Sequence, residues 1–123
     1  MPRRLTSAEL KGVLAYHTGS QEFFRYALMR SSFIYTEGVR TFCEEGGNAG
    51  AYWFLDIVAT EVLPAKQPFA LITINVNAQA AVITGDDGDG NIFWRRAIDY
   101  TDLQEGQWKF YFVDNTLLLP SEY

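Results

Sequence analysis

The sequence predicts a two-layer α+β fold, in which N-terminal helices pack on one face of a C-terminal antiparallel sheet of about four strands. The evidence is a change in the spacing of apolar residues at Pro64. Before this proline, apolar residues recur every three or four positions, as in 52–59. After it, short apolar runs such as 69–76 are separated by turn clusters of Gly, Asp and Asn. The first spacing is typical of helices and the second of strands.

Length and composition fit a single domain that spans residues 1–123. With 48% apolar and 15% aromatic residues, the chain can fill a core without disulfides or metals. The formal net charge of −5 argues against direct nucleic-acid binding, because phosphate backbones repel acidic surfaces. No signal peptide and no apolar run of roughly 20 residues is present, so we expect no membrane contact. The single cysteine, Cys43, fits the reducing cytoplasm.

A capping box opens the first predicted helix. In Thr6-Ser-Ala-Glu9 the threonine hydroxyl can accept from the amide of the glutamate, whose carboxylate reaches back to the threonine amide. The helix carries Leu10, Val13 and Leu14, and we expect it to end before Gly19.

Two more helices are predicted before the sheet. The stretch 21–35 fits neither period, so we expect an irregular segment with a short helix or a short strand in it. Thr36 is the predicted N-cap of the second helix, which the glycines 46–47 stop. Asn48 is the predicted cap of a third helix that runs to about Val62. Because this helix is apolar around most of its circumference, we expect it to be the most buried one.

The second half of the chain predicts strands at 69–76, 79–85, 91–99 and 107–113. The predicted hairpin turns are Asn77-Ala78 and the acidic segment 86–90, where Asp-Gly permits positive φ angles. Alternation along the strands places apolar side chains toward the helices and polar ones on the other face. The C-terminal run 117–120 is too apolar to stay exposed, and we expect an edge strand or a cover for the core.

Asp56 is a carboxylate within the most apolar predicted helix. A partly buried carboxylate with a raised pKa would be a candidate general base, with Tyr52 or Tyr16 as its neighbour. The structural interpretation is a narrow polar stripe with Tyr52, in which a hydrogen bond to a tyrosine or a pairing with Arg95 or Arg96 satisfies the carboxylate. We favour the structural interpretation, because buried charges are more often paired than catalytic.

The acidic turn begins like a calcium-binding loop, with Asp86, Asp87 and Asp89 followed by Asn91. A calcium loop that started at Asp87 would need glycine at its sixth position, where this chain has Ile92. We therefore predict a solvated hairpin turn and no metal site.

The remaining polar residues do not assemble a catalytic set. His17 is the only histidine and Cys43 the only cysteine, which is too few for a zinc site or a Ser-His-Asp triad. Two acidic residues follow Cys43 near the end of its helix and raise the pKa of the thiol, so we predict an inert core residue. The glycine-rich segments 46–50 and 85–90 match no phosphate-binding motif. We expect a non-enzymatic protein without a cofactor.

Three aromatic residues, Phe93, Tyr100 and Tyr111, are predicted on or near the sheet face opposite the main apolar set. Cross-strand aromatic pairs can stabilise a sheet without any further role. A contiguous aromatic patch can instead mark a dimer or partner surface. Both interpretations stay open, and these residues, with Asp86, Asp87 and Asp89, are the predicted partner-binding set.

Five segments carry a resemblance to a known family: Tyr35-Thr-Glu-Gly-Val39, Gly50-Ala-Tyr-Trp-Phe-Leu-Asp56, Gly85-Asp-Asp-Gly-Asp-Gly-Asn91, Tyr100-Thr-Asp102 and Leu117-Leu-Leu-Pro-Ser-Glu-Tyr123. From about Gly19 to the last residue, the chain resembles small bacterial proteins that form a domain family of unknown function, found in accessory genomes, plasmids and phage. The resemblance implies a small stand-alone domain. It implies no catalytic residues, because the family has none assigned.

These observations leave three functional hypotheses. The leading one is a small acidic protein that acts through a protein partner or through self-association. In a mobile-element setting it could inhibit host defence as an anti-restriction or anti-CRISPR protein. The second is an acidic nucleic-acid mimic, whose carboxylates would align like duplex phosphates: Glu44, Glu45, Asp86, Asp87, Asp89, Asp99, Asp102 and Glu105. The third is a small enzyme centred on Asp56 and a neighbouring tyrosine.

Overall fold

A computed structural model describes residues 4–18, 22–28 and 30–123. The helical elements are α1 (Ser7–Ala15), α2 (Glu37–Glu45), α3 (Trp53–Ile57), the π-helical turn η1 (Val58–Val62) and the 3-10 turns η2 (Leu63–Ala65) and η3 (Pro120–Glu122). The strands are β1 (Phe23–Leu28), β2 (Ser31–Thr36), β3 (Phe69–Asn77), β4 (Ala80–Asp86), β5 (Ile92–Ile98), β6 (Gly106–Val113) and β7 (Thr116–Leu118).

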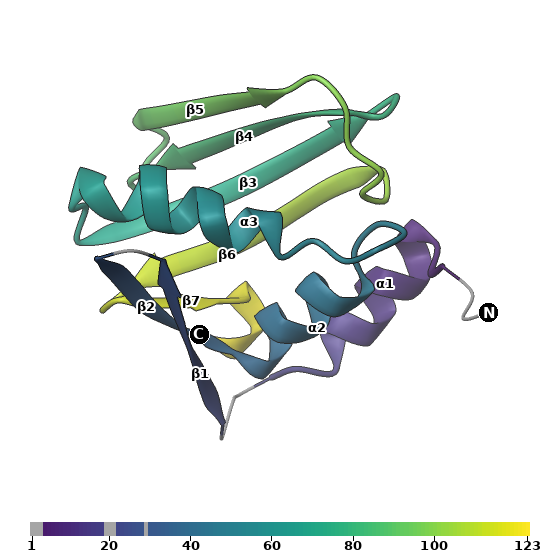
Figure 1. Ribbon diagram of the computed structural model, residues 1–123, viewed down its shortest axis with the longest axis horizontal. Coiled ribbons are helices and arrows are strands. Elements are labelled where there is room, and N and C mark those ends of the chain that lie inside the picture. Colours follow the sequence, from purple (N-terminus) through teal and green to yellow (C-terminus); the bar gives the residue numbers. More distant parts are fainter. Residues whose placement is uncertain (1–3, 19–21, 29) are drawn as a thin grey trace.

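The described strands form one sheet in the order β1-β2-β7-β6-β3-β4-β5, and α1, α2 and α3 lie on the same face of it (Figure 1). The predicted α+β class is confirmed. The predicted antiparallel sheet of about four strands is wrong in its detail. The described sheet has seven strands, and β2 and β7 run parallel.

The first two helices begin as predicted. Thr6 caps α1, since its hydroxyl accepts from the Glu9 amide at 3.1 Å and its own amide donates to the Glu9 carboxylate at 2.9 Å. Gly19, before which α1 was expected to end, lies outside the described residues. Thr36 caps α2 by accepting from the Val39 amide at 3.4 Å. The glycine that follows α2, Gly46, is its C-cap.

The third helix begins later than predicted and changes its type. It starts at Trp53 rather than near Asn48, because Gly47 and Gly50 have φ angles of +66° and +92°, which no right-handed helix contains. The helical path then continues through the π-helical turn η1 to Val62, and η2 adds a 3-10 turn.

The stretch 21–35 forms most of an antiparallel β1–β2 hairpin, so the alternative of a strand is confirmed, while the prediction of an irregular segment around it is wrong. Its first residue, Gln21, lies outside the described residues. Burial alternates along β1, but the outward-facing Phe23 and Ala27 are themselves apolar. Because apolar residues therefore occupy both faces of the strand, the period of two is hidden in the sequence.

The C-terminal run forms β7 in the interior of the sheet, so the prediction of an edge strand is wrong. Asp114 and Asn115 have φ angles of 52° and 57°, which make a tight turn and bring β7 back antiparallel to β6. On its other side β7 pairs parallel with β2, and Leu117 is fully buried. The run therefore does cover the core, as the alternative expectation stated.

The strands β3 to β6 form in the four predicted segments, with antiparallel pairing between β3 and β4, β4 and β5, and β3 and β6. The β3–β4 turn is centred on Ala78 and Gln79, with φ angles of 52° and 65°, rather than on Asn77-Ala78. The last strand in the sheet order, β5, is an edge strand.

Aromatic rings fill the space between the sheet and the helices. Phe42 of α2 lies with its ring centroid 4.9 Å from Phe110 and 5.8 Å from Trp108, and Phe54 of α3 lies 4.7 Å from Phe110. All four side chains are buried. Because each helix contributes a ring to the same cluster, α2 and α3 are fixed relative to the sheet.

Candidate functional site

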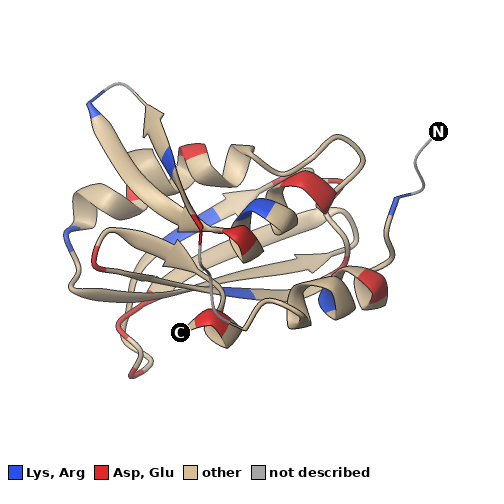
Figure 2. Cartoon of the chain, turned by 90° about the horizontal axis from the view of Figure 1, so that it is seen from below, with Lys and Arg blue, Asp and Glu red and all other residues tan. Residues whose placement is uncertain are grey.

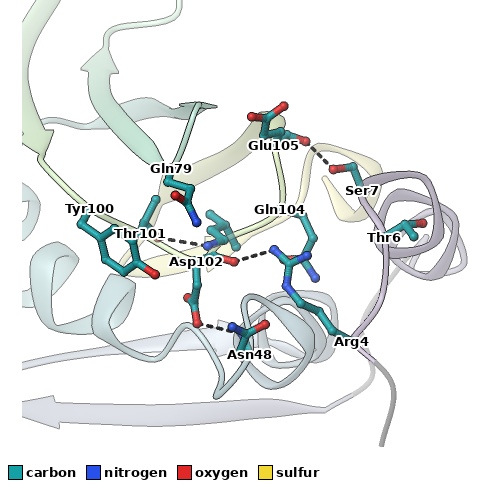
Figure 3. A pocket seen from close by; sticks show the side chains of 11 residues that line it. Arg4, Thr6, Ser7, Asn48, Gln79, Tyr100, Thr101, Asp102, Gln104 and Glu105 are labelled. Atoms are coloured by element: carbon teal, nitrogen blue, oxygen red, sulfur yellow. Dashed lines mark hydrogen bonds between the residues drawn. The ribbon is translucent and has the colours of Figure 1, made fainter.

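The segment 99–105 joins β5 to β6 and separates two surface pockets. The pocket in Figure 3 has a volume of about 540 Å³ and lies between this segment and the start of α1; we call it the Arg4 pocket. A pocket of about 600 Å³ lies between the same segment, the end of β5 and the start of α3; we call it the Trp53 pocket. Tyr100, Thr101 and Asp102 line both pockets.

Gln104 holds this segment in place from inside the protein. Its side chain is 1% exposed, and its Oε1 accepts from the amide of Gly47 at 2.8 Å. Its Nε2 donates to the carbonyl oxygens of Leu5 at 2.8 Å and Glu45 at 3.1 Å. Its own carbonyl accepts from Nε1 of Trp108 at 2.9 Å. One glutamine thereby ties the segment to the loop before α1, the end of α2 and β6.

Asp102 fixes the loop between α2 and α3 against the same segment. Its Oδ2 accepts from the Asn48 amide at 2.9 Å, and its carbonyl oxygen accepts from Nη2 of Arg4 at 2.6 Å (Figure 3). A side chain on Gly47 would overlap the Asp102 carboxylate, so only glycine fits there.

Most polar groups of the Arg4 pocket are engaged in holding the backbone. The Ser7 hydroxyl donates to the carbonyl of Glu105 at 2.6 Å (Figure 3), and Oε1 of Glu105 accepts from the Ala78 amide at 2.9 Å. The Thr101 amide donates to the carbonyl of Gln79 at 2.8 Å. This pocket therefore acts as the framework that positions Tyr100 to Asp102.

The Trp53 pocket combines aromatic surface with carboxylates. Trp53, at the start of α3, and Tyr100, whose side chain is 68% exposed, are its two aromatic residues. The charged residues that line it are Arg96, Asp99 and Asp102. Asp99 is exposed and makes no hydrogen bond or ion pair with any other described residue.

The one cation in this lining is already paired. Arg96 forms an ion pair with Glu61, and the other carboxylate oxygen of Glu61 accepts from Nε1 of Trp94 at 3.2 Å. Because Arg96 is neutralised by Glu61, the carboxylates of Asp99 and Asp102 leave the pocket with net negative charge.

This arrangement suits a guanidinium or ammonium group. Aromatic faces attract cations through the ring quadrupole. Carboxylates add charge-assisted hydrogen bonds, which are shorter and stronger than neutral ones. A basic side chain that entered the Trp53 pocket could contact Trp53 or Tyr100 through its stem and the Asp99 carboxylate through its charged head.

Of the three predicted aromatic residues, Tyr100 alone lines these pockets. Tyr111 pairs with Leu71 and packs with Phe69 and Tyr123, with ring centroids 5.1 Å and 5.2 Å away. Leu71 also pairs with Asp86, so Tyr111 lies at the acidic-turn end of the sheet. The three residues therefore do not form one patch.

Phe93 packs against the core, so its predicted place on the opposite face is wrong. The β4–β5 register shifts between Gly85 and Asp86, which is a bulge. As a result, the rings of Phe93 and Trp94 come within 3.1 Å and 3.3 Å of the place a Cβ on Gly85 would take. A bulge breaks strict alternation, which is why two consecutive residues face one way.

The acidic turn is held by its own carboxylates. Asp86 accepts from the Gly88 amide at 2.7 Å, and Asp87 accepts from the Asp89 amide at 2.9 Å and from the Asn91 side chain at 2.8 Å. The hydrogen bond from Asn91 is the main reason why the pKa of Asp87 is lowered. Among the described residues, no cluster of three or more His, Cys, Asp or Glu side chains is placed to hold a metal ion.

Asp56 is exposed, so the partly buried carboxylate that the general-base alternative requires is not found. Its carboxylate accepts a hydrogen bond from the hydroxyl of Tyr26 in β1, so the expected hydrogen bond to a tyrosine is confirmed, with Tyr26 as the donor rather than Tyr52 or Tyr16. Burial and this hydrogen bond raise the pKa of Tyr26 to about 12. In place of the predicted polar stripe of Tyr52 and Asp56, the carboxylate of Asp56 makes a contact between α3 and β1. This contact gives no support to a general base at this position.

Cys43 and His17 have different surroundings in the structure. Cys43 is fully buried, and burial followed by the charge of Glu44 raises the pKa of its thiol to about 12. His17 instead contacts the hydroxyl of Thr41 at 3.2 Å. The prediction of an inert core cysteine agrees with this burial.

Sequence reasoning did not select Gln104, Trp53 or Glu61. A lone glutamine carries no signal of burial, because its partners are backbone groups distant in sequence. In the sequence Trp53 stands out only as part of an apolar helix and of the resemblance segment 50–56. Asp99 is selected only as one of a set of acidic residues, and Asp102 also as part of the resemblance segment 100–102. Their placement beside Trp53 depends on the β5–β6 connection.

Among the helices of the described chain, none has the length and apolar character needed to cross a membrane. The model of a family of unknown function (DUF6876) matches residues 8–123. The match thus begins before Gly19, where the resemblance in sequence was expected to start. No curated protein and no solved structure matches the chain.

Proposed function

This chain belongs to DUF6876, a family of unknown function, and we propose from its geometry that it is a non-enzymatic binding protein whose Trp53 pocket receives a basic side chain of a protein partner. A single observation carries this proposal. The pocket places Asp99, which has no partner among the described residues, next to an exposed Tyr100, while its cation Arg96 is held by Glu61. Aromatic and basic residues dominate the contacts that matter most at protein interfaces.

The acidic side chains do not favour a nucleic-acid mimic to the same degree. Glu44 pairs with Arg40, while Asp87, Asp102 and Glu105 accept hydrogen bonds from nearby backbone amides. Figure 2 shows acidic residues spread over helices, turns and loops rather than along one line. A mimic needs a row of free charges at the spacing of phosphates.

The resemblance to proteins of plasmids and phage supports a finer proposal, in which the partner is a host-defence protein. Restriction and CRISPR effectors bind nucleic acid, and such surfaces expose arginine and lysine. A pocket for a basic side chain would engage that kind of surface. Phage plating on a restricting or CRISPR-active host that expresses this protein tests this process. Protection by the wild type and its loss on Asp99→Asn are expected, and equal protection by both would contradict it.

The pocket itself is tested by titrating ¹⁵N-labelled protein with N-acetyl-arginine amide and following amide and indole shifts by NMR. We expect the largest shifts at Trp53, Asp99 and Tyr100. N-acetyl-glutamine amide, which is neutral, serves as the control ligand. Shifts that concentrate at the acidic turn 86–90, or equal shifts with both ligands, would contradict the proposal.

A pair of tyrosine variants separates the pocket from general surface effects. Tyr100→Ala should weaken arginine binding several-fold, since a cation–π contact at an exposed site contributes about 0.5–1 kcal/mol. Tyr16→Ala removes a tyrosine that is even more exposed, 88% against 68% for Tyr100, from the end of α1 and should leave binding unchanged. Equal effects of the two substitutions would remove the support for the Trp53 pocket.

A further inference from the structure

The strand that borders the Trp53 pocket is also a free edge of the sheet. In the described residues β5 pairs with β4 alone, because it stands last in the strand order. An edge strand presents unpaired N–H and C=O groups along its outer side, which can pair with another extended chain.

The part of β5 beside the pocket is regular. The register shift lies at Gly85 and Asp86, opposite the first half of β5. From there the ladder runs without interruption through Arg95, opposite Thr84, to Ile98, opposite Ala81. A regular strand can accept a neighbour, whereas a bulge twists the edge away from one.

The pocket opens along this same regular part. Its lining includes four consecutive residues, 96–99, together with Tyr100 and, across the pocket, Trp53 of α3. Arg96 and Ile98 pair with Ile83 and Ala81, which are buried under the helices, so this side of β5 faces the pocket. In a strand added next to β5, every second side chain would point to the same side and reach the pocket.

The charges at this edge favour a partner segment that carries basic residues. Arg96 is neutralised by Glu61, and Arg95 lies on the opposite face, in the cross-strand row of Thr84. Asp99 is left at the end of the strand without a partner among the described residues. A segment with basic residues at alternate positions would therefore match both the backbone edge and the pocket.

We infer that the partner contributes an extended basic segment, which adds as a further strand to the outer edge of β5 and places one arginine or lysine in the Trp53 pocket. This inference rests on the proposed function, since it names the mode in which the basic side chain arrives. Main-chain hydrogen bonds to β5 supply affinity, and the pocket supplies the selection of a basic residue.

Calorimetry with three synthetic octapeptides tests the inference. The parent peptide alternates arginine and threonine, and its two derivatives carry backbone N-methyl groups on all arginines or on all threonines. In an added strand, alternate amides point toward β5 and the others toward solvent. One derivative should therefore lose affinity about tenfold or more, while the other stays within about twofold of the parent.

Amide hydrogen exchange provides the second readout. With the parent peptide bound, alternate amides between Arg95 and Ile98 should exchange more slowly, while those of the other edge strand, β1, should be unchanged. Equal affinity of the two N-methylated peptides, whether both bind or both fail, would overturn strand addition. In that case parent binding that is still lost on Asp99→Asn would leave the pocket itself intact. A parent peptide that does not bind at all would overturn the pocket and strand addition together.

Discussion

The carboxylate of Glu122, one residue before the C-terminus, accepts a hydrogen bond of 2.6 Å from the hydroxyl of Thr36 at the start of α2. Its other oxygen accepts from the Gly38 amide at 3.2 Å. Thr36 in turn accepts from the Val39 amide, so a side chain from the chain end and the N-cap residue act together at one helix terminus. A negative charge is favourable there, because the helix dipole is positive at its N-terminus.

Glu122→Ala is predicted to lower the free energy of unfolding by about 2 kcal/mol, because it removes charge-assisted hydrogen bonds from a partly buried helix start. Urea denaturation followed by circular dichroism measures this change. Asp89→Ala removes an exposed carboxylate from the acidic turn, and as a control it should change stability by no more than about 0.5 kcal/mol. Equal stability of Glu122→Ala and the wild type would show that the C-terminal turn does not hold α2.

Gln104→Ala is predicted to destabilise the protein by about 3 kcal/mol. It leaves the buried amide of Gly47 and the carbonyls of Leu5 and Glu45 without their partner, and unsatisfied buried polar groups are costly. The matched control is Gln107→Ala, which removes only an exposed hydrogen bond to Asn75. Thermal unfolding of the two variants checks the prediction. If the Gln104 variant were no less stable than the Gln107 variant, the role of Gln104 in holding the segment 99–105 would be contradicted.

Two glycine-to-alanine substitutions should have opposite signs. Gly47→Ala is expected to cost more than about 2 kcal/mol, because residue 47 has a φ of +66° and a methyl group there would overlap Asp102. Gly12→Ala, within α1 and with no atom near its Cβ position, should stabilise by about 0.5–1 kcal/mol. Denaturant midpoints of the two variants report the signs, and a neutral Gly47→Ala would refute the close packing of the two loops.

The Tyr26–Asp56 contact predicts a dependence of stability on alkaline pH. Tyr26 has a pKa of about 12 in the folded protein, above the ordinary tyrosine pKa of 10.0 that applies to the unfolded chain. The raised pKa means that its contribution to stability is fully present below about pH 10 and is lost as the pH rises toward 12.

Tyr26→Phe should therefore make the decline of the unfolding free energy between pH 10 and 12 shallower. Tyr16→Phe, a change at an exposed tyrosine, should leave the decline as in the wild type. Asp56→Asn should lower the pKa of Tyr26 only in part, because burial is the larger cause. Absorbance titration of the tyrosinates measures this, and an unchanged titration in Asp56→Asn would show that the hydrogen bond has no influence.

Local signals in the sequence were sufficient where a helix terminus or a strand depends on neighbouring residues. The capping box of Thr6 and Glu9 and the cap at Thr36 each need only a few residues and were predicted correctly. Contacts between distant segments were not predictable. The hairpin β1–β2 was missed because Phe23 is apolar and exposed, and β7 was misplaced because its parallel partner β2 had not been recognised.

The candidate site was predictable only in fragments. Tyr100 was selected as an exposed aromatic residue, and it is exposed. Its neighbours in the pocket come from α3 and from the β5–β6 connection, which no local pattern links. Phe93 was misplaced because nothing in the sequence indicates the bulge at Gly85. A tyrosine partner of Asp56 was expected, but its identity as Tyr26 was not predictable, because β1 was not recognised as a strand.

A pair of charge-matched variants tests the binding role of Asp99 most directly. Asp99→Asn and Asp114→Asn each remove one negative charge, the first in the Trp53 pocket and the second in the β6–β7 turn. In calorimetric titrations with the alternating arginine–threonine octapeptide, Asp99→Asn should weaken binding about tenfold, which corresponds to about 1.4 kcal/mol, while Asp114→Asn should stay within about twofold of the wild type. Equal losses in the two variants would mean that the peptide responds only to net charge, and the proposed pocket would then be refuted.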